Sequence, residues 1–236
     1  IVDGTKGDVE LKRVDIIMSK SRLLATGRVE GTKGIKGKRI IVNVKSSATD
    51  LSELLRLVSK AGRPVADGVL TIDAAMDLPQ GRQPVLERLS LAGSVRADRL
   101  TFTNDAVQDK IDELSRRGRG KPGDETINDV ASKMVTTFTL EKGVAVYRNF
   151  AFAVRGATIR LDGTHSLKTK AVDLSGAVLL NASISNTQTG FKSWVLKPFD
   201  ALFRKGGAGS RLAITVQGTQ DQPKLEFDFK RTLKGS

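Results

Sequence analysis

The sequence contains no cysteine and only one histidine, His165, in 236 residues. The absence of cysteine excludes a disulfide framework, a thiolate zinc site and a cysteine nucleophile. A Ser-His-Asp hydrolase would need His165, which lies in a turn-to-strand context without a nucleophile elbow. No acidic triplet has the spacing of a calcium-binding loop. We therefore expect no catalytic residues, no metal and no cofactor, and we predict that the protein is not an enzyme.

Aromatic residues make up only 5% of the chain. No apolar run approaches the roughly 20 residues that a membrane-spanning helix requires. The formal net charge of +13 nevertheless favours anionic partners. Proteins that bind single-stranded nucleic acid stack bases on exposed aromatics, whereas the phenylalanines here mostly follow the apolar phase of strands and the basic residues are dispersed over many turns. These features argue against nucleic acid and favour an acidic lipid surface.

Segments in which apolar and polar residues alternate are abundant. The clearest covers residues 69–78, and others follow throughout residues 144–229. Period-two alternation places alternate side chains on opposite faces of a strand. We predict a mainly β protein with a long, twisted antiparallel sheet that has one apolar face, in a single domain over residues 1–236. The carboxylates of Asp73, Asp77, Asp162 and Asp173 alternate with apolar neighbours and are expected to face solvent.

Breaks in the alternation predict two to four short amphipathic helices and one bulge or strand break. Asp50 and Glu53 form a capping-box-like start for a helix whose apolar side chains share one face, namely Leu51, Leu54, Leu55 and Val58. Asn104 begins a second helix, which precedes Gly118, and a third is expected over residues 125–134. A shift of the alternation at Asp98 and Arg99 predicts a β-bulge or a break in the strand.

The segment 190–205 combines large apolar residues with lysine and arginine. If it is helical, an apolar face is formed by Val195, Phe199, Leu202 and Phe203, with Trp194 at its start. Pro198 either kinks this helix or begins it. The helix is expected to cover the end of the sheet, to face a membrane with Trp194 at the level of the headgroups, or to do both.

Several segments resemble the C-terminal region of AsmA-like proteins. They are residues 102–120, 154–163, 172–176, 190–192, 197–199 and 214–224. The resemblance implies a cell-envelope protein, so the chain would be a C-terminal fragment of a longer protein that is anchored in the inner membrane. It also implies a bridge-like lipid transporter, in which a long sheet curls into an apolar-lined groove. Such a groove would carry phospholipid acyl chains across the periplasm and support outer-membrane biogenesis.

The resulting hypothesis is a lipid-binding and transfer segment that contacts acyl chains with low specificity. The expected contacts are Leu70, Ile72, Met76, Leu91, Val95, Phe138, Leu140, Phe150, Phe152 and Val154. The basic surface would favour anionic headgroups. Alternation is identical in an open groove and in a closed sandwich whose two faces satisfy each other. The residues therefore leave open a closed β-rich structural or interaction module that docks on another envelope protein, for example through an edge strand.

Overall fold

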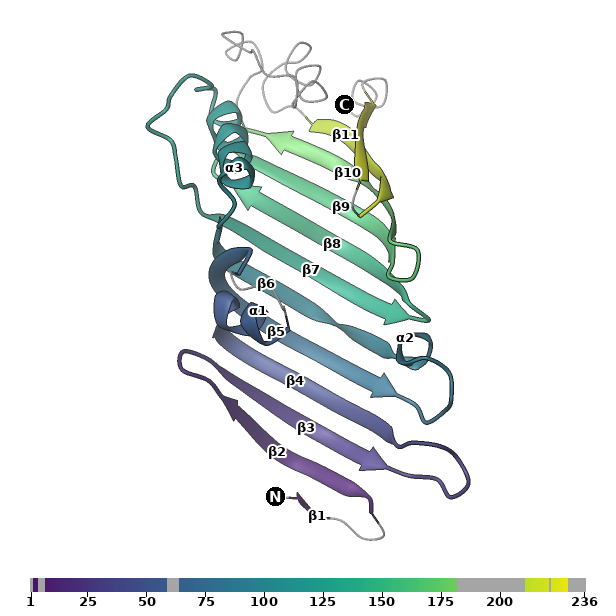
Figure 1. The fold of residues 1–236 in the computed structure, drawn as a ribbon. Helices are drawn as coiled ribbons and strands as arrows, with labels where there is room; N and C mark the ends of the chain where they lie inside the picture. The colour runs from purple at the N-terminus through teal and green to yellow at the C-terminus, as the bar shows by residue number, and fades with distance from the viewer. Residues whose placement is uncertain (1, 4–6, 59–63, 182–210, 221, 229–236) are drawn as a thin grey trace.

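The computed structural model describes residues 2–3, 7–58, 64–181, 211–220 and 222–228. Their strands form one open antiparallel sheet of twelve strands, in which every strand pairs with its neighbours in the sequence (Figure 1). The strands are β1 (Val2–Asp3), β2 (Val9–Ile17), β3 (Arg22–Glu30), β4 (Arg39–Asp50), β5 (Ala66–Leu78), β6 (Ser90–Phe102), β7 (Ser132–Glu141), β8 (Val144–Val154), β9 (Ala157–Ser166), β10 (Ala171–Leu180), β11 (Arg211–Thr219) and β12 (Gln222–Asp228). The helices are α1 (Leu51–Val58), α2 (Val85–Arg88) and α3 (Asp105–Gly118). The predicted fold class is confirmed.

One face of this sheet is apolar from strand to strand. Residues that lie opposite each other in an antiparallel pair place their side chains on the same face. The pairing thus links five strands, β4 to β8, through Val44, Ala74, Gly93, Phe138 and Tyr147. We call this the inner face. The adjacent line of paired residues on the outer face is mostly polar and consists of Lys45, Asp73, Ser94, Thr137 and Arg148.

Bulges in β2, β4, β6 and β8 keep the apolar residues on the inner face. In each strand two consecutive residues oppose a single residue of the partner, namely Lys12-Arg13, Ser47-Ala48, Asp98-Arg99 and Arg148-Asn149. The residue that follows therefore returns to the inner face, as Leu100 does after Ala97. The bulge predicted at Asp98 and Arg99 is confirmed. Bulges bend strands and increase their twist, so four of them across one sheet favour its curling.

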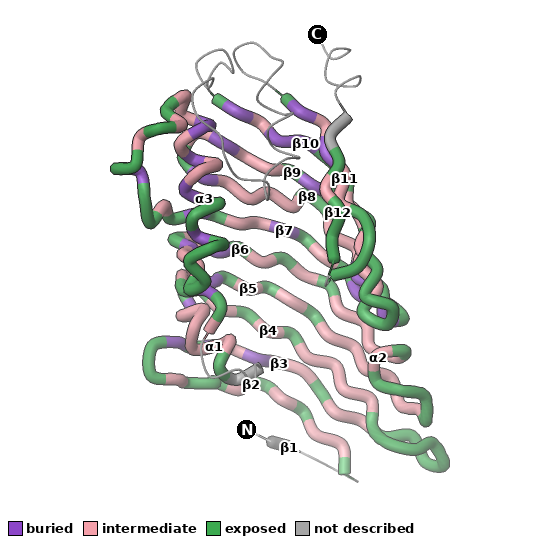
Figure 2. Tube along the Cα trace, turned by 45° about the horizontal axis from the view of Figure 1, so that its top comes forward, coloured by how far each residue is buried: buried purple, intermediate pink, exposed green. Residues whose placement is uncertain are grey.

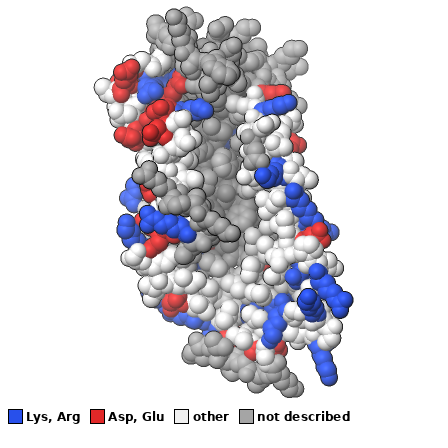
Figure 3. Space-filling model, viewed as in Figure 1, with Lys and Arg blue, Asp and Glu red and all other residues white. Residues whose placement is uncertain are grey.

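The curled sheet forms an elongated trough. Figure 3 shows the molecule hollowed along its length between two walls. Consecutive strands of a meander are connected at alternate ends of the strands. The connections therefore form two groups, one along each long side of the sheet. We call the side that carries α1 and α3 the helix wall, and the opposite side, which carries α2, the turn wall (Figure 1).

Helices α1 and α3 bury the inner face along the helix wall. Leu51 and Leu54 of α1 pack against the cluster of Leu70, Ala97 and Leu100. Ile111 and Leu114 of α3 pack against a larger cluster, which consists of Val154, Ala157, Leu161, Val178, Leu180, Leu212 and Ile214. Buried residues accordingly gather near the helices, whereas much of the middle of the strands is of intermediate exposure (Figure 2).

The helix predicted over residues 125–134 is wrong. This stretch contains turns up to residue 131 and then enters β7 at Ser132. Its backbone groups bond to α3 instead of to each other: the Asp112 carboxylate accepts the N–H groups of Asp129 and Val130, and the Arg116 guanidinium donates to the Ile127 carbonyl. Tertiary hydrogen bonds thus replace those of a helix.

Candidate functional site

The part of the inner face that lies between the two walls is the candidate site, and we call it the groove. The described residues contain a single sheet, so no second sheet among them covers this surface. Its side chains are therefore half-buried, as at Met76, Leu91, Phe138 and Leu174. A continuous apolar surface that is left partly open on a monomer is typical of a site for an apolar ligand or partner.

The structure brings all ten predicted lipid contacts to the inner face. Leu70, Leu140 and Val154 are only 6%, 5% and 8% exposed, respectively, so these three side chains belong to the packed interior and have little surface to offer a ligand. Leu70 lies in the α1 cluster and Val154 in the α3 cluster. The other seven are half-buried, namely Ile72, Met76, Leu91, Val95, Phe138, Phe150 and Phe152.

The inner face extends beyond the strands on which these contacts were predicted. Val42 and Val44 of β4 pair with Met76 and Ala74, so they lie on the same face at one end. At the other end the face continues over β10 to β12 through Leu174, Val216 and Leu225. The period-two pattern of these segments predicts which of their side chains share a face. Only the strand order shows that this face continues the inner face of the other strands.

Glycines open the floor of the groove at several points. A Cβ on Gly93, Gly163 or Gly176 would lie 2.5, 2.1 or 1.9 Å from a backbone oxygen of the neighbouring strand, far closer than van der Waals contact. The strands can approach this closely only because no side chain is present. The groove therefore has shallow, side-chain-free places among large apolar residues such as Phe138 and Tyr147.

Charged residues are confined mainly to the outer face of the strands. Arg39 donates two hydrogen bonds to Asp77, at 3.0 and 2.6 Å, which hold the pKa of that carboxyl below its ordinary value. Lys45 lies 3.1 Å from Asp73. Asp162 and Asp173 are exposed on the same face, so the predicted solvent-facing position of these four carboxylates is confirmed. The outer face can remain hydrated while the inner face is apolar.

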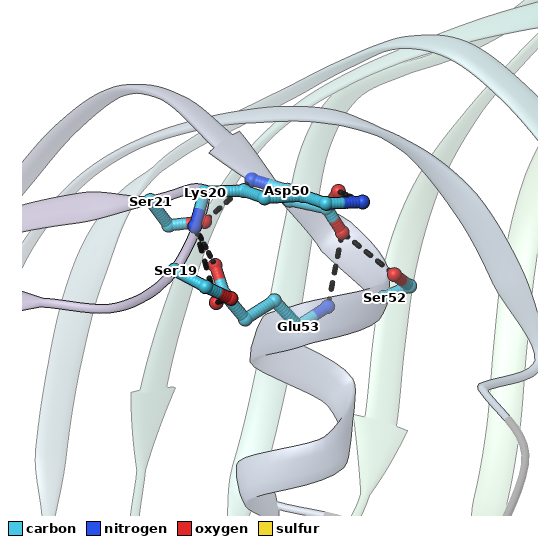
Figure 4. A network of polar contacts seen from close by, with 6 residues as sticks. All are labelled: Ser19, Lys20, Ser21, Asp50, Ser52 and Glu53. Carbon is cyan, nitrogen blue, oxygen red and sulfur yellow. Dashed lines mark hydrogen bonds and ion pairs between the residues drawn. The ribbon is translucent and has the colours of Figure 1, made fainter.

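Polar contacts fasten α1 to the β2–β3 turn at the helix wall (Figure 4). The Asp50 carboxylate accepts the Glu53 N–H at 3.0 Å and the Ser52 hydroxyl at 2.6 Å, and these two bonds lower the pKa of Asp50. The Glu53 carboxylate accepts the Ser19 hydroxyl and the Lys20 N–H from the β2–β3 turn, and its pKa is lowered by the Ser19 bond above all. Asp50 thus caps the helix as predicted, whereas Glu53 joins the helix to another element.

His165 lies on the inner face of β9, opposite Ala145 and Val172. Its Nε2 is buried and has no hydrogen-bond partner among the described residues. The described part of the chain also has no cluster of three acidic or histidine side chains that could hold a metal ion. None of the helices in that part is both long enough and apolar enough to span a bilayer.

The predicted membrane-facing residues Trp194, Val195, Phe199, Leu202 and Phe203 lie outside the described residues. Comparison of the chain with protein-family models, curated proteins and solved structures finds no match. Function is therefore inferred from the geometry and chemistry of the groove.

Proposed function

We propose that this chain is a non-enzymatic segment that binds phospholipid and transfers it by holding acyl chains in the groove. The observation that carries this proposal is the apolar inner face, which continues across a single open sheet and lines a hollow (Figure 3). The resemblance to AsmA-like bridge proteins supports the same function. A periplasmic location, an inner-membrane anchor in the parent protein and a role in outer-membrane biogenesis belong to this proposal and rest on the resemblance.

The dimensions of the sheet suit a path longer than one lipid. Neighbouring strands lie about 4.8 Å apart, so twelve strands extend over about 50 Å along the groove. One leaflet of the hydrocarbon core of a bilayer is about 15 Å thick. An acyl chain would thus occupy only part of the groove, and further lipids could follow it along the same surface.

The chemistry of the groove suits transfer better than selective binding. Each buried CH₂ group contributes about 0.8 kcal/mol, so contact with a few residues such as Met76, Leu91 and Phe138 retains an acyl chain without polar recognition. Because similar contacts repeat from strand to strand, a chain that leaves one position gains equivalent contacts at the next. Headgroups would remain at the open side of the groove, where water and the charged side chains of the two walls lie.

A single introduced cysteine tests this proposal, because the chain has none of its own. Met76→Cys places a probe on the inner face and Ala75→Cys places one on the outer face of the same strand, as a matched control. Each cysteine is labelled with a polarity-sensitive dye, and a fatty acid that carries a nitroxide on its chain is added. The nitroxide should quench the fluorescence of the dye at the inner position. The outer position should not respond.

Mass spectrometry of gently purified protein should in addition find co-purifying phospholipid. Equal quenching at both positions, or no quenching at either together with lipid-free protein, would contradict the proposal.

The alternative was a closed β-rich module. The described strands form an open sheet, because β1 and β12 lie at its two ends and do not pair with each other. Docking of another envelope protein on either edge strand remains a prediction.

A further inference from the structure

The connections of the turn wall are strongly basic. They comprise the described residues 7–8, 31–38, 79–89, 142–143, 167–170 and 220, and they contain eight basic and two acidic side chains. The basic residues are Lys33, Lys36, Lys38, Arg82, Arg88, Lys142, Lys168 and Lys170, and the acidic ones are Asp8 and Glu87. Glu87 lies 2.9 Å from Lys168 and offsets that charge. We call the basic set the cationic rim.

The described connections of the helix wall have no such excess. These connections, residues 18–21, 51–58, 64–65, 103–131, 155–156 and 181, contain eight basic and eight acidic side chains. Figure 3 shows lysine and arginine on both walls, and a group of aspartate and glutamate residues at one end of the helix wall. Among the described residues, the turn wall therefore carries a net positive charge and the helix wall does not.

Apolar side chains project among the cations of the rim. Ile35 is 51% exposed, Val85 of α2 is 54% exposed and Leu167 is 40% exposed. Basic residues that surround exposed aliphatic side chains are typical of surfaces that bind the headgroup region of a bilayer.

Hydrogen bonds hold two of these loops together as one shelf. The Thr32 N–H donates to Gln80 Oε1 at 2.9 Å, and Gln80 Nε2 donates to the Gly37 carbonyl at 2.7 Å. The Gly81 N–H donates to the Lys36 carbonyl at 3.1 Å. Lys33, Lys36 and Lys38 are exposed and form no ion pair with a described residue. Because these hydrogen bonds already fix the two loops, binding of the three lysines to an anionic surface would cost little backbone conformational entropy.

We infer that the cationic rim docks the turn wall of the groove on an anionic bilayer surface, so that the groove lies along the membrane and its open side adjoins the lipids. The bilayer is the partner that fits best, because it offers negative charge and an apolar interior over the length of the rim, and the rim presents cations and aliphatic side chains together. The inference extends the proposed function, since it names the surface from which the groove would take lipid.

Vesicle binding tests the inference on the whole chain. Each lysine near an anionic surface raises affinity about fivefold, so the combined change Lys33→Gln, Lys36→Gln and Lys38→Gln should weaken binding to phosphatidylcholine–phosphatidylglycerol vesicles about a hundredfold. The matched control removes three exposed cations from the helix wall, by Arg56→Gln, Lys110→Gln and Lys121→Gln, and should weaken binding less than about threefold. Vesicles of phosphatidylcholine alone should bind neither variant nor the unaltered chain. Equal losses in the two variants would overturn the inference.

A labelled cysteine reports whether the rim itself enters the lipid. With a polarity-sensitive dye, Ile35→Cys should shift to shorter wavelength when anionic vesicles are added, whereas Val107→Cys, 39% exposed on α3, should not. A shift at Val107→Cys without one at Ile35→Cys would contradict the inference. If the chain takes up nitroxide fatty acid but ignores anionic vesicles, or binds heparin alone, docking is wrong and the groove proposal stands. If it binds vesicles through the rim but takes up no acyl chain, docking stands and the groove proposal fails.

Discussion

Replacement of Gly118 by alanine tests how α3 closes over the helix wall. Gly118 is the last residue of α3 and lies against Gly156 in the β8–β9 turn. A Cβ at Gly118 would lie 2.4 Å from the Gly156 carbonyl oxygen, 2.5 Å from its carbon and 3.0 Å from Ala157 Cβ. Ser115 of the same helix turn donates to the Arg155 carbonyl at 2.8 Å, so the helix is also held down beside this contact.

Two effects of Gly118→Ala oppose each other. Alanine favours the helix over glycine by up to about 1 kcal/mol. The new methyl group would have to displace backbone by about 1 Å, and such overpacking costs about 1–3 kcal/mol. Because the obstacle is a backbone carbonyl and not a flexible side chain, we place the cost near the upper end of this range. The free energy of unfolding should fall by about 1–2 kcal/mol, which for a chain of this size lowers the melting temperature by about 5 °C.

Urea denaturation followed by circular dichroism measures this change. The matched control is Gly123→Ala in the loop after α3, where a Cβ would meet no atom within 4 Å. The control should be neutral or slightly more stable than the original chain. If Gly118→Ala proves as stable as the control, α3 does not rest on the β8–β9 turn in the way described, and the reasoning fails.

Two further changes concern the attachment of α1. Asp50→Ala removes the cap of α1 and should lower the free energy of unfolding by about 1 kcal/mol at neutral pH. Because the folded pKa of Asp50 is lowered, this contribution is complete above the pKa of an unfolded aspartate, about 3.9, and is lost as the pH falls through the folded value. Thermal melts should therefore converge for the two proteins in acid, and a constant gap would contradict this assignment. Thr49 is 0% exposed and its hydroxyl has no hydrogen-bond partner among the described residues, so Thr49→Val should raise the free energy of unfolding by about 1 kcal/mol. The control Thr139→Val, at an exposed position, should not raise it. If urea denaturation shows that Thr49→Val is less stable than the original chain, the hydroxyl has a partner and the reasoning fails.

Local patterns in the sequence predict the faces of the strands well. The alternation of Leu70, Ile72 and Met76 with Asp73 and Asp77 places the first three on the inner face, as the structure confirms. The same holds for the cap at Asp50. These features depend on neighbouring residues along the chain, because side chains alternate along any strand and a helix start needs a local acceptor.

Long-range contacts account for the features that the sequence predicted wrongly or not at all. Residues 125–131 avoid a helix because Asp112 and Arg116 of α3 satisfy their backbone groups. The sequence showed one of the four bulges, since a skipped residue becomes evident only against its partner strand. Leu70, a predicted lipid contact, is instead buried because α1 packs against its cluster.

The sequence by itself determined that this protein has strands with one apolar and one polar face, because that property belongs to each strand separately. Only the tertiary structure decided that the strands follow one another in an open sheet, so that these faces join into a groove and are not sealed against a second layer. It also decided where the charge lies. Basic residues that are distant in the sequence, such as Lys36, Arg82 and Lys168, lie along the cationic rim because a meander sends every second connection to the same ends of the strands.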